Sequence, residues 1–258
     1  MRPALHAEWT KLRTVAGPRW LLLGLVAATV ALSAAATSVV TCTSAGCGGD
    51  LTRLSLIGVL LGQAPAVILA VLVISGEYSS GMIRTTLTAM PPRATAFAAK
   101  AGTLAGVVAV AGTAAVLGSL LAGRILLPRH GFTAARGHPA LSLTDGPTLR
   151  ATAGSILYLT LVALLSLGIA AVVRDSATSI GVVLGLLYLP PVLAQVIGDP
   201  HWQRLLQQIA PMSAGLAIQA TTDLHGLPLR PWAGLGVTAG WAAAALMAGG
   251  LVLRVRDA

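Results

Sequence analysis

The sequence predicts an all-α, polytopic membrane protein with six transmembrane helices, on the basis of composition, scarce aromatic residues and six long apolar runs. Hydrophobic residues make up 55% of the 258 residues and charged residues 10%, whereas soluble domains are roughly 25% charged. The mean hydropathy is +0.82. Aromatic residues make up only 4% of the chain, which argues against an outer-membrane barrel with its aromatic girdles and favours helices.

Six apolar runs reach the roughly 20 residues that a helix needs to cross about 30 Å of hydrocarbon. They are residues 20–40, 54–75, 97–122, 151–173, 176–198 and 232–253. Lys100 is the only charged residue within them, and it lies near enough to an end of its run to snorkel toward the headgroups. Because a charge at mid-span costs about 2.5–3.5 kcal/mol on the insertion scale, this pattern supports six spans in a single transmembrane domain, residues 1–258.

The basic residues indicate a multi-pass protein of the cell (plasma) membrane with both termini in the cytoplasm. With this orientation, the inner Lys and Arg residues lie in short segments, and the outer ones are mostly spread over two longer loops. The positive-inside rule gives most weight to short flanks. The motif SAAAT, residues 33–37, follows apolar residues of the first run and also resembles a signal-peptide cleavage site, but the run at 20–40 exceeds a signal core of about 7–15 residues.

Besides the segment at 76–93, two segments outside the spans are amphipathic. In ALHAEWTKLR, residues 4–13, Leu5, Trp9 and Leu12 share one face, which predicts an N-terminal interfacial helix, with a merely charged tail as the alternative. Residues 201–224 have apolar side chains at helical spacing, interrupted at Pro211. They predict a short outer helix or a re-entrant hairpin before the last span.

Several kinds of chemistry find no support in the sequence. The formal charge is +9, but the basic residues are scattered rather than gathered on one face, so no nucleic-acid partner is expected. All five His lie outside the spans, which contain no Asp or Glu, and this argues against an intramembrane enzyme or metal site. An ion-coupled transporter would usually need such groups, although backbone sites at broken helices remain an alternative.

The two cysteines, Cys42 and Cys47, follow the first span within CTSAGC. On the outer side of the membrane the setting is oxidising, so the spacing is compatible with a small-loop disulfide. Free thiols are the alternative, and too few other ligands lie nearby for a metal.

Polar and helix-disturbing residues occur at depth in two spans. Prolines free backbone carbonyls, and a Gln in lipid must find a partner or face a cavity. One hypothesis is that Gln63, Pro65, Pro190 and Gln195 line a translocation path. The other is that they only pack the bundle through interhelical hydrogen bonds.

Pairs of glycines four residues apart occur in four spans and allow close helix approach, within one subunit or between two. They are Gly58/Gly62, Gly102/Gly106, Gly181/Gly185 and Gly236/Gly240. In a chain with 29 Gly they are weak evidence for a dimer.

The segment GEYSSGMIRTTLTAMPPR, residues 76–93, joins the second and third spans on the predicted cytoplasmic side. Ser80 is a good N-cap, and Ile83, Leu87 and Met90 form an apolar stripe before two prolines end the pattern. The spacing predicts a short amphipathic helix along the membrane surface. Such a helix either packs against the bundle or docks in a groove of another protein.

Together with HAEWTKLRT, RDS, PMSAG and the terminal LRVRDA, this segment resembles the ATP-binding cassette type-2 permeases of high-GC Gram-positive bacteria. The resemblance implies the type-2 exporter membrane fold and a dimer of permease subunits, homo- or heterodimeric, bound to separate ATPase subunits. It also implies that the helix near Ser80–Met90 is the coupling helix that docks in the ATPase. The residues expected to couple to the ATPase are Glu77, Tyr78, Ser80, Met82, Ile83, Arg84, Leu87 and Met90.

The expected function is therefore that of an exporter permease, which is not itself an enzyme. The only lysines, Lys11 and Lys100, do not lie in a phosphate-binding loop, so the chain is not expected to be its own P-loop ATPase. The resemblance implies that this chain binds no cofactor and that the partner ATPase uses ATP and Mg²⁺. The sequence departs from a transporter of a defined substrate in having no obvious polar pocket. The alternatives are a non-transporting membrane protein, such as an immunity or sensory factor, and a secondary transporter.

Overall fold

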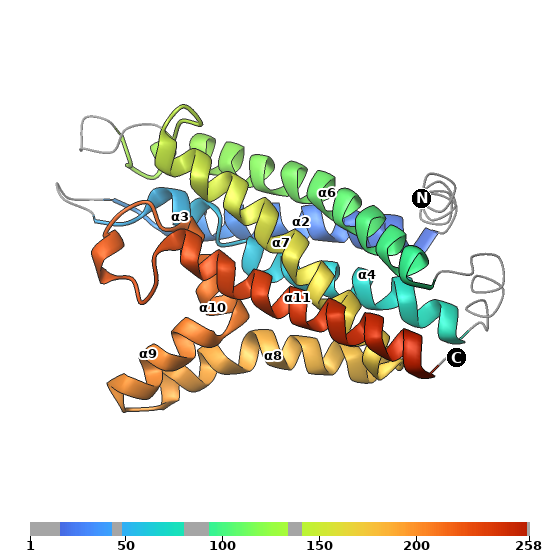
Figure 1. Cartoon of the computed structure of the whole chain (residues 1–258). Helices are drawn as coiled ribbons and strands as arrows, with labels where there is room; N and C mark the ends of the chain where they lie inside the picture. Colours follow the sequence, from blue (N-terminus) through green and yellow to red (C-terminus); the bar gives the residue numbers. More distant parts are fainter. Residues whose placement is uncertain (1–15, 43–47, 80–92, 134–140, 257–258) are drawn as a thin grey trace.

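The computed structural model describes residues 16–42, 48–79, 93–133 and 141–256, and in this part of the chain it confirms the predicted fold class. The regular structure there is helical, and six of the helices are long and apolar enough to cross a membrane (Figure 1). The predicted N-terminal interfacial helix, within residues 4–13, lies outside the described residues.

Five of the spans are single helices that match the predicted runs. They are α2 (Ala16–Val39), α6 (Arg93–Arg129), α7 (Gly146–Val173), α8 (Ser176–Val196) and α11 (Pro231–Arg256). Helix α6 has 37 residues and is therefore about 55 Å long at 1.5 Å per residue. It exceeds its predicted run at both ends, because an apolar run marks only the part of a helix that lies within hydrocarbon.

The second span is broken, which corrects the prediction of one helix over 54–75. It consists of α3 (Leu51–Ser55), a turn at 56–58 and α4 (Val59–Ser79). The turn packs tightly against α2, since a Cβ on Gly58 would lie 1.8 Å from the carbonyl oxygen of Thr29. Ser33 of α2 accepts a 3.0 Å hydrogen bond at its Oγ from the Gly58 N–H. The Ser33 hydroxyl thus accepts a hydrogen bond from a backbone N–H that has no intrahelical partner at the break.

The fourth and fifth spans are joined by only two residues. Arg174 ends α7 in the left-handed conformation, with φ of 65°. Asp175 caps α8, and its carboxylate accepts a 2.7 Å hydrogen bond from the Thr178 N–H. The hydrogen bonds from Thr178 lower the pKa of the exposed Asp175 carboxyl. This sharp turn makes α7 and α8 antiparallel neighbours.

A helical hairpin precedes the last span, as residues 201–224 predicted. It comprises α9 (Pro200–Ile209), α10 (Pro211–Leu216), η2 (Ala217–Gln219) and η3 (Leu224–Gly226). No residue of α9 is buried, whereas α10 is mostly buried. The indole of Trp241 and the hydroxyl of Thr238, both from α11, donate 2.9 Å hydrogen bonds to the carbonyls of Ile209 and Pro211. These bonds hold the hairpin against the bundle.

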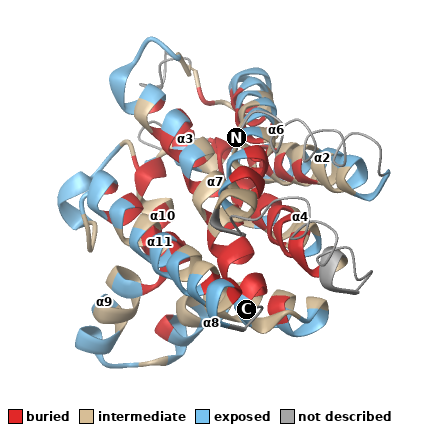
Figure 2. Cartoon of the chain, turned by 45° about the vertical axis from the view of Figure 1, so that its right-hand side comes forward, coloured by how far each residue is buried: buried red, intermediate tan, exposed pale blue. Residues whose placement is uncertain are grey.

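The core of the bundle surrounds α7, and Figure 2 shows the buried residues concentrated there and on α3 and α4. In their most apolar stretches, α4, α6 and α7 have 50–56% of residues buried, whereas α2, α8 and α11 have 22%. Figure 1 shows α8 and α9 along one side of the bundle. Three spans therefore have about half of these residues buried, and the other three have most of them at least partly exposed.

Candidate functional site

The predicted coupling segment lies only partly within the described residues. Helix α4 continues to Ser79, so Glu77 and Tyr78 belong to its last turn. The remaining coupling residues, Ser80, Met82, Ile83, Arg84, Leu87 and Met90, lie outside the described part of the chain. Helix α6 starts at Arg93, directly after the two prolines. The coupling role of this segment stays a prediction.

The two ends of the bundle differ in what they contain. The end of α4, the start of α6, the turn at 174–175 and the last turns of α11 lie at one end, which we call the terminal end (Figure 1). The short helix α3, the hairpin α9–α10 and the start of α11 lie at the other, which we call the hairpin end. Segment 80–92 therefore connects two spans at the terminal end.

Gln63 lies in a closed polar cluster inside the bundle. It is fully buried, and its Oε1 accepts a 2.5 Å hydrogen bond from the hydroxyl of Tyr158 on α7. Its Nε2 lies 3.1 Å from the Sδ of Met212 on α10. One turn earlier, the carbonyl of Leu60 accepts a 2.5 Å hydrogen bond from the hydroxyl of Tyr188 on α8. Gln63 and its neighbours thus connect α4 with α7, α8 and α10.

The other proposed path residues lie in different surroundings. Pro65 and Pro190 are half-buried, and α4 and α8 continue through them without a break. Gln195 is exposed near the end of α8, and no hydrogen bond joins it to Gln63. The structure therefore does not gather these four residues into one cluster, and a translocation path along them stays a prediction.

Lys100 points into the bundle, which corrects the expectation that it snorkels. It is only 6% exposed, and its Nζ donates a 3.3 Å hydrogen bond to the carbonyl of Val73 on α4. The ammonium therefore lies at the terminal end of the α4–α6 interface, where a backbone carbonyl of α4 accepts one of its hydrogen bonds.

Cys42 is disulfide-bonded and buried at the end of α2. Its N–H donates a 2.9 Å hydrogen bond to the carbonyl of His130, which follows α6. The chain has one other cysteine, Cys47, which lies outside the described residues, so the pairing of the two stays a prediction.

The glycine pairs divide into two groups. Gly58 and Gly62 pack inside the subunit, and a Cβ on Gly62 would lie 1.9 Å from the Oγ1 of Thr29. By contrast, a Cβ on Gly181, Gly236 or Gly240 would meet nothing within 4 Å. Close packing within the subunit therefore explains one pair, and the others face outward from the bundle.

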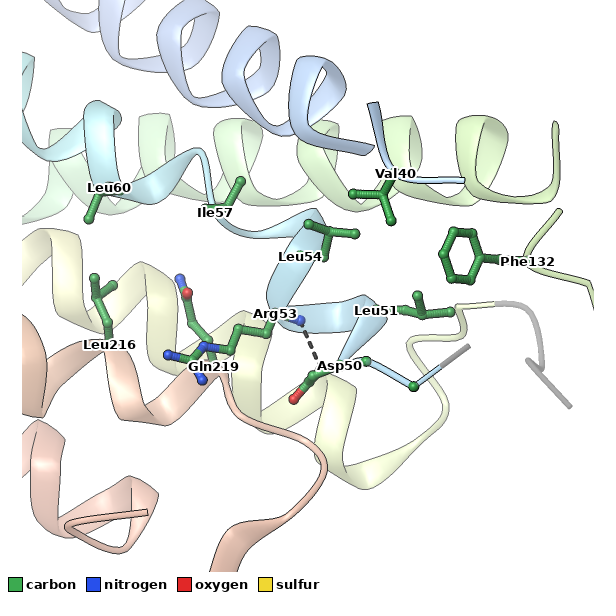
Figure 3. Close-up of a pocket in the computed structure, with 12 residues that line it drawn as sticks. Val40, Asp50, Leu51, Arg53, Leu54, Ile57, Leu60, Phe132, Leu216 and Gln219 are labelled. Atoms are coloured by element: carbon green, nitrogen blue, oxygen red, sulfur yellow. Dashed lines mark hydrogen bonds between the residues drawn. The ribbon is translucent and has the colours of Figure 1, made fainter. Parts of the chain in front are cut away.

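A cavity of about 560 Å³ lies at the hairpin end, beside the break in the second span (Figure 3). Most of its wall is apolar, and the polar side chains on it are Asp50, Arg53 and Gln219. Its apolar wall includes Leu51, Leu54, Ile57, Leu60, Phe132 and Leu216. Pockets of about 300–1,000 Å³ with such walls and a few polar groups suit small ligands.

Asp50 holds one wall of this cavity in place. Its carboxylate accepts hydrogen bonds from the N–H of Arg53 at 2.9 Å and from the hydroxyl of Thr221 at 2.7 Å. The backbone N–H groups of Thr221 and Thr222 also donate to it. Asp50 is thus both the N-cap of α3 and the anchor of the loop after η2.

Gln219 supports the broken backbone from the other side of the cavity. It is 4% exposed, and its Nε2 donates to the carbonyl of Leu56, at 3.4 Å, and to the Oγ of Ser155, at 3.1 Å. The Leu56 carbonyl belongs to the turn between α3 and α4. A side chain from the hairpin thus adds a second donor to this carbonyl, which also accepts a 3.1 Å hydrogen bond from the Val59 N–H.

Sequence reasoning missed the residues of this cavity and the partners of Gln63. Tyr158 carried one signal, because a Tyr inside an apolar run needs a hydrogen-bond partner. Arg53 and Gln219 carried no such signal, since Arg53 directly precedes the predicted span 54–75 and Gln219 lies in the segment expected to form a short outer helix or a re-entrant hairpin. Within the described residues, no three His, Cys, Asp or Glu side chains lie together as metal ligands would.

A scan against protein-family models and a search among curated proteins found no match for this chain.

Proposed function

We propose that the chain is the membrane-spanning permease subunit of an ATP-binding cassette exporter. In this proposal it works in the cell membrane with its termini in the cytoplasm, paired with a second permease subunit. A separate ATPase subunit docks on residues 76–93 and drives export of a substrate. The chain itself is not an enzyme and binds no cofactor, because ATP and Mg²⁺ are used by the ATPase.

The observation that carries the proposal is the agreement between the architecture and the one that the sequence resemblance implies. The protein has six spans, and a short helical hairpin stands between the fifth and the sixth. The resemblance was based on short motifs, which do not by themselves require that arrangement. The number of spans and the position of the hairpin thus agree with the proposed function.

The exposed spans support a second subunit in the proposal. Helices α2, α8 and α11 each bury 22% of the residues in their most apolar stretch. They carry outward-facing small residues such as Gly181, Gly236 and Gly240. Such faces accept either lipid or another helix at close range.

The experiment that tests the proposal is co-purification of the chain with the ATPase encoded by a neighbouring reading frame. Leu87→Asp places a charge on the predicted apolar stripe and should abolish co-purification while leaving membrane insertion unchanged. Thr88→Asp adds the same charge on the opposite face and is the matched control. It should retain most of the ATPase.

Two outcomes would contradict the proposal. One is the absence of any P-loop ATPase that co-purifies with the wild-type chain. The other is equal recovery of the ATPase by the wild type and Leu87→Asp, which would mean that the stripe packs against the bundle instead.

A further inference from the structure

The cavity at the hairpin end has unused binding groups beyond its apolar wall. Arg53 is exposed, and among the described residues neither a hydrogen bond nor an ion pair engages its guanidinium. Gln219 uses only its Nε2, so its Oε1 receives no hydrogen bond there. One cation with several donors and one nearly buried acceptor therefore line the same apolar cavity (Figure 3).

Asp50, the acidic residue on the cavity wall, does not neutralise the guanidinium of Arg53. The Asp50 carboxylate already accepts hydrogen bonds from three backbone N–H groups and one hydroxyl. Those hydrogen bonds hold the carboxylate in the cavity wall. No ion pair joins Asp50 to the guanidinium of Arg53 within the described residues, so that group is available to a ligand.

The break in the second span gives a separate reason to expect a ligand here. The turn directly precedes the candidate membrane-spanning stretch Val59–Gly76. In membrane proteins, irregular backbone is found where it is buried in protein or lines a cavity, and broken helices often hold ligands. In this chain the turn at 56–58 does both, because Gly58 is buried against α2 while Ile57 lines the cavity. The leucines of α3 and α4 extend this apolar wall toward Leu60 (Figure 3).

We infer that this cavity binds an amphiphile with an anionic head group, a carboxylate or a phosphate that also offers a hydroxyl or N–H donor. The guanidinium of Arg53 binds the anion, and the Oε1 of Gln219 accepts a hydrogen bond from the donor. The apolar tail lies along Leu54, Ile57 and Leu60. The site is independent of the proposed permease function, because it requires neither an ATPase nor a second subunit.

The test uses the full chain, purified in a non-ionic detergent, and equilibrium binding of dodecanoyl lysophosphatidylglycerol. The wild type should bind this lipid saturably and about tenfold more tightly than dodecanoyl lysophosphatidylcholine, whose head group is zwitterionic. Glycerol 3-phosphate, which has the head group without a tail, should bind much more weakly. Equal binding of glycerol 3-phosphate and the lysolipid would identify a site for free phosphates and overturn the amphiphile proposal.

Two variants separate the head-group contact from the apolar one. Arg53→Gln should lower the affinity for lysophosphatidylglycerol about tenfold and leave that for lysophosphatidylcholine unchanged. Arg204→Gln removes an exposed arginine of α9 that does not line the cavity, and it should change neither affinity. Ile57→Trp fills the cavity and should weaken both lysolipids, whereas Val196→Trp, on the exposed side of α8, should not.

Either of two results would overturn the proposal. In the first, Arg53→Gln leaves the preference for the anionic lysolipid intact. In the second, Arg204→Gln reduces that preference as much as Arg53→Gln does, which would mean that the net charge of the surface, rather than a site, attracts the lipid.

Discussion

The second span carries two polar sites that differ in whether their hydrogen-bonding groups are satisfied. At the Gln63 site, both ends of the buried amide have partners inside the protein, Tyr158 and Met212. At the Arg53 site, the guanidinium and the Oε1 of Gln219 have none among the described residues, and both face a cavity. The two sites begin only ten residues apart in the sequence.

This difference shows that a polar residue in an apolar run is not by itself a functional site. Gln63 was the obvious candidate in the sequence, and the structure places it in a closed cluster that joins α4, α7 and α10. The open site was not obvious, because it required a break in the span and a side chain from the hairpin. Unsatisfied groups that face a cavity indicate a ligand better than polarity alone does.

The largest expected effect concerns the break that separates the two sites. In Gly58→Ala, the new Cβ would lie 1.8 Å from the carbonyl oxygen of Thr29, so α2 or the turn must move. We expect a loss of about 3 kcal/mol, the upper part of the usual range for overpacking, measured as thermal or denaturant unfolding in one detergent. Gly236→Ala is the matched control, because its Cβ meets nothing within 4 Å. Equal stability of the two variants would show that α2 does not pack against the break.

A second prediction tests whether the polar groups of Gln63 and Tyr158 satisfy each other inside the bundle. Gln63→Leu leaves the buried hydroxyl of Tyr158 without its acceptor, which should destabilise the fold by about 1–3 kcal/mol. The double variant Gln63→Leu/Tyr158→Phe removes both partners and should recover most of that loss in the same unfolding measurement. If the two substitutions instead add independently, the hydrogen bond between these side chains contributes nothing to stability.

The smallest expected effect concerns Asp50, whose hydrogen bonds hold one wall of the Arg53 cavity in place. Asp50→Ala removes a helix cap and the anchor of Thr221 and Thr222. Asp175→Ala removes only a cap, at the start of α8, and is the matched control. We expect Asp50→Ala to cost about 1 kcal/mol more than Asp175→Ala, measured by the same unfolding assay. An equal cost would mean that the loop after η2 holds its place without Asp50.

Most of the helical elements could be predicted from the sequence. An apolar run of about 20 residues can bury its backbone in lipid only as a helix, so composition alone indicates where spans occur. The separation of α9 from α10 was also predictable, since Pro211 cannot continue a preceding helix without losing a hydrogen bond.

The break in the second span could not be predicted in the same way. Pro65 looked like the disturbing residue, yet α4 continues through it, and the chain breaks at 56–58, where no proline occurs. The break depends on α2, where Ser33 accepts a hydrogen bond from the Gly58 N–H and Thr29 packs against Gly58, and on Gln219 of the hairpin, which donates to the Leu56 carbonyl. No local pattern contains that information.

The sequence by itself determined that this is a membrane protein, how many spans it has and where the hairpin lies. These properties follow from the length of the apolar runs and from the effect of proline on a helix. Only the tertiary structure decided which polar groups are satisfied and which face a cavity. The physical reason is that a hydrogen bond in the bundle joins residues as distant as Gln63 and Met212 or Leu56 and Gln219. Whether such a partner is present depends on how the helices pack. The residue pattern along one helix does not contain this information.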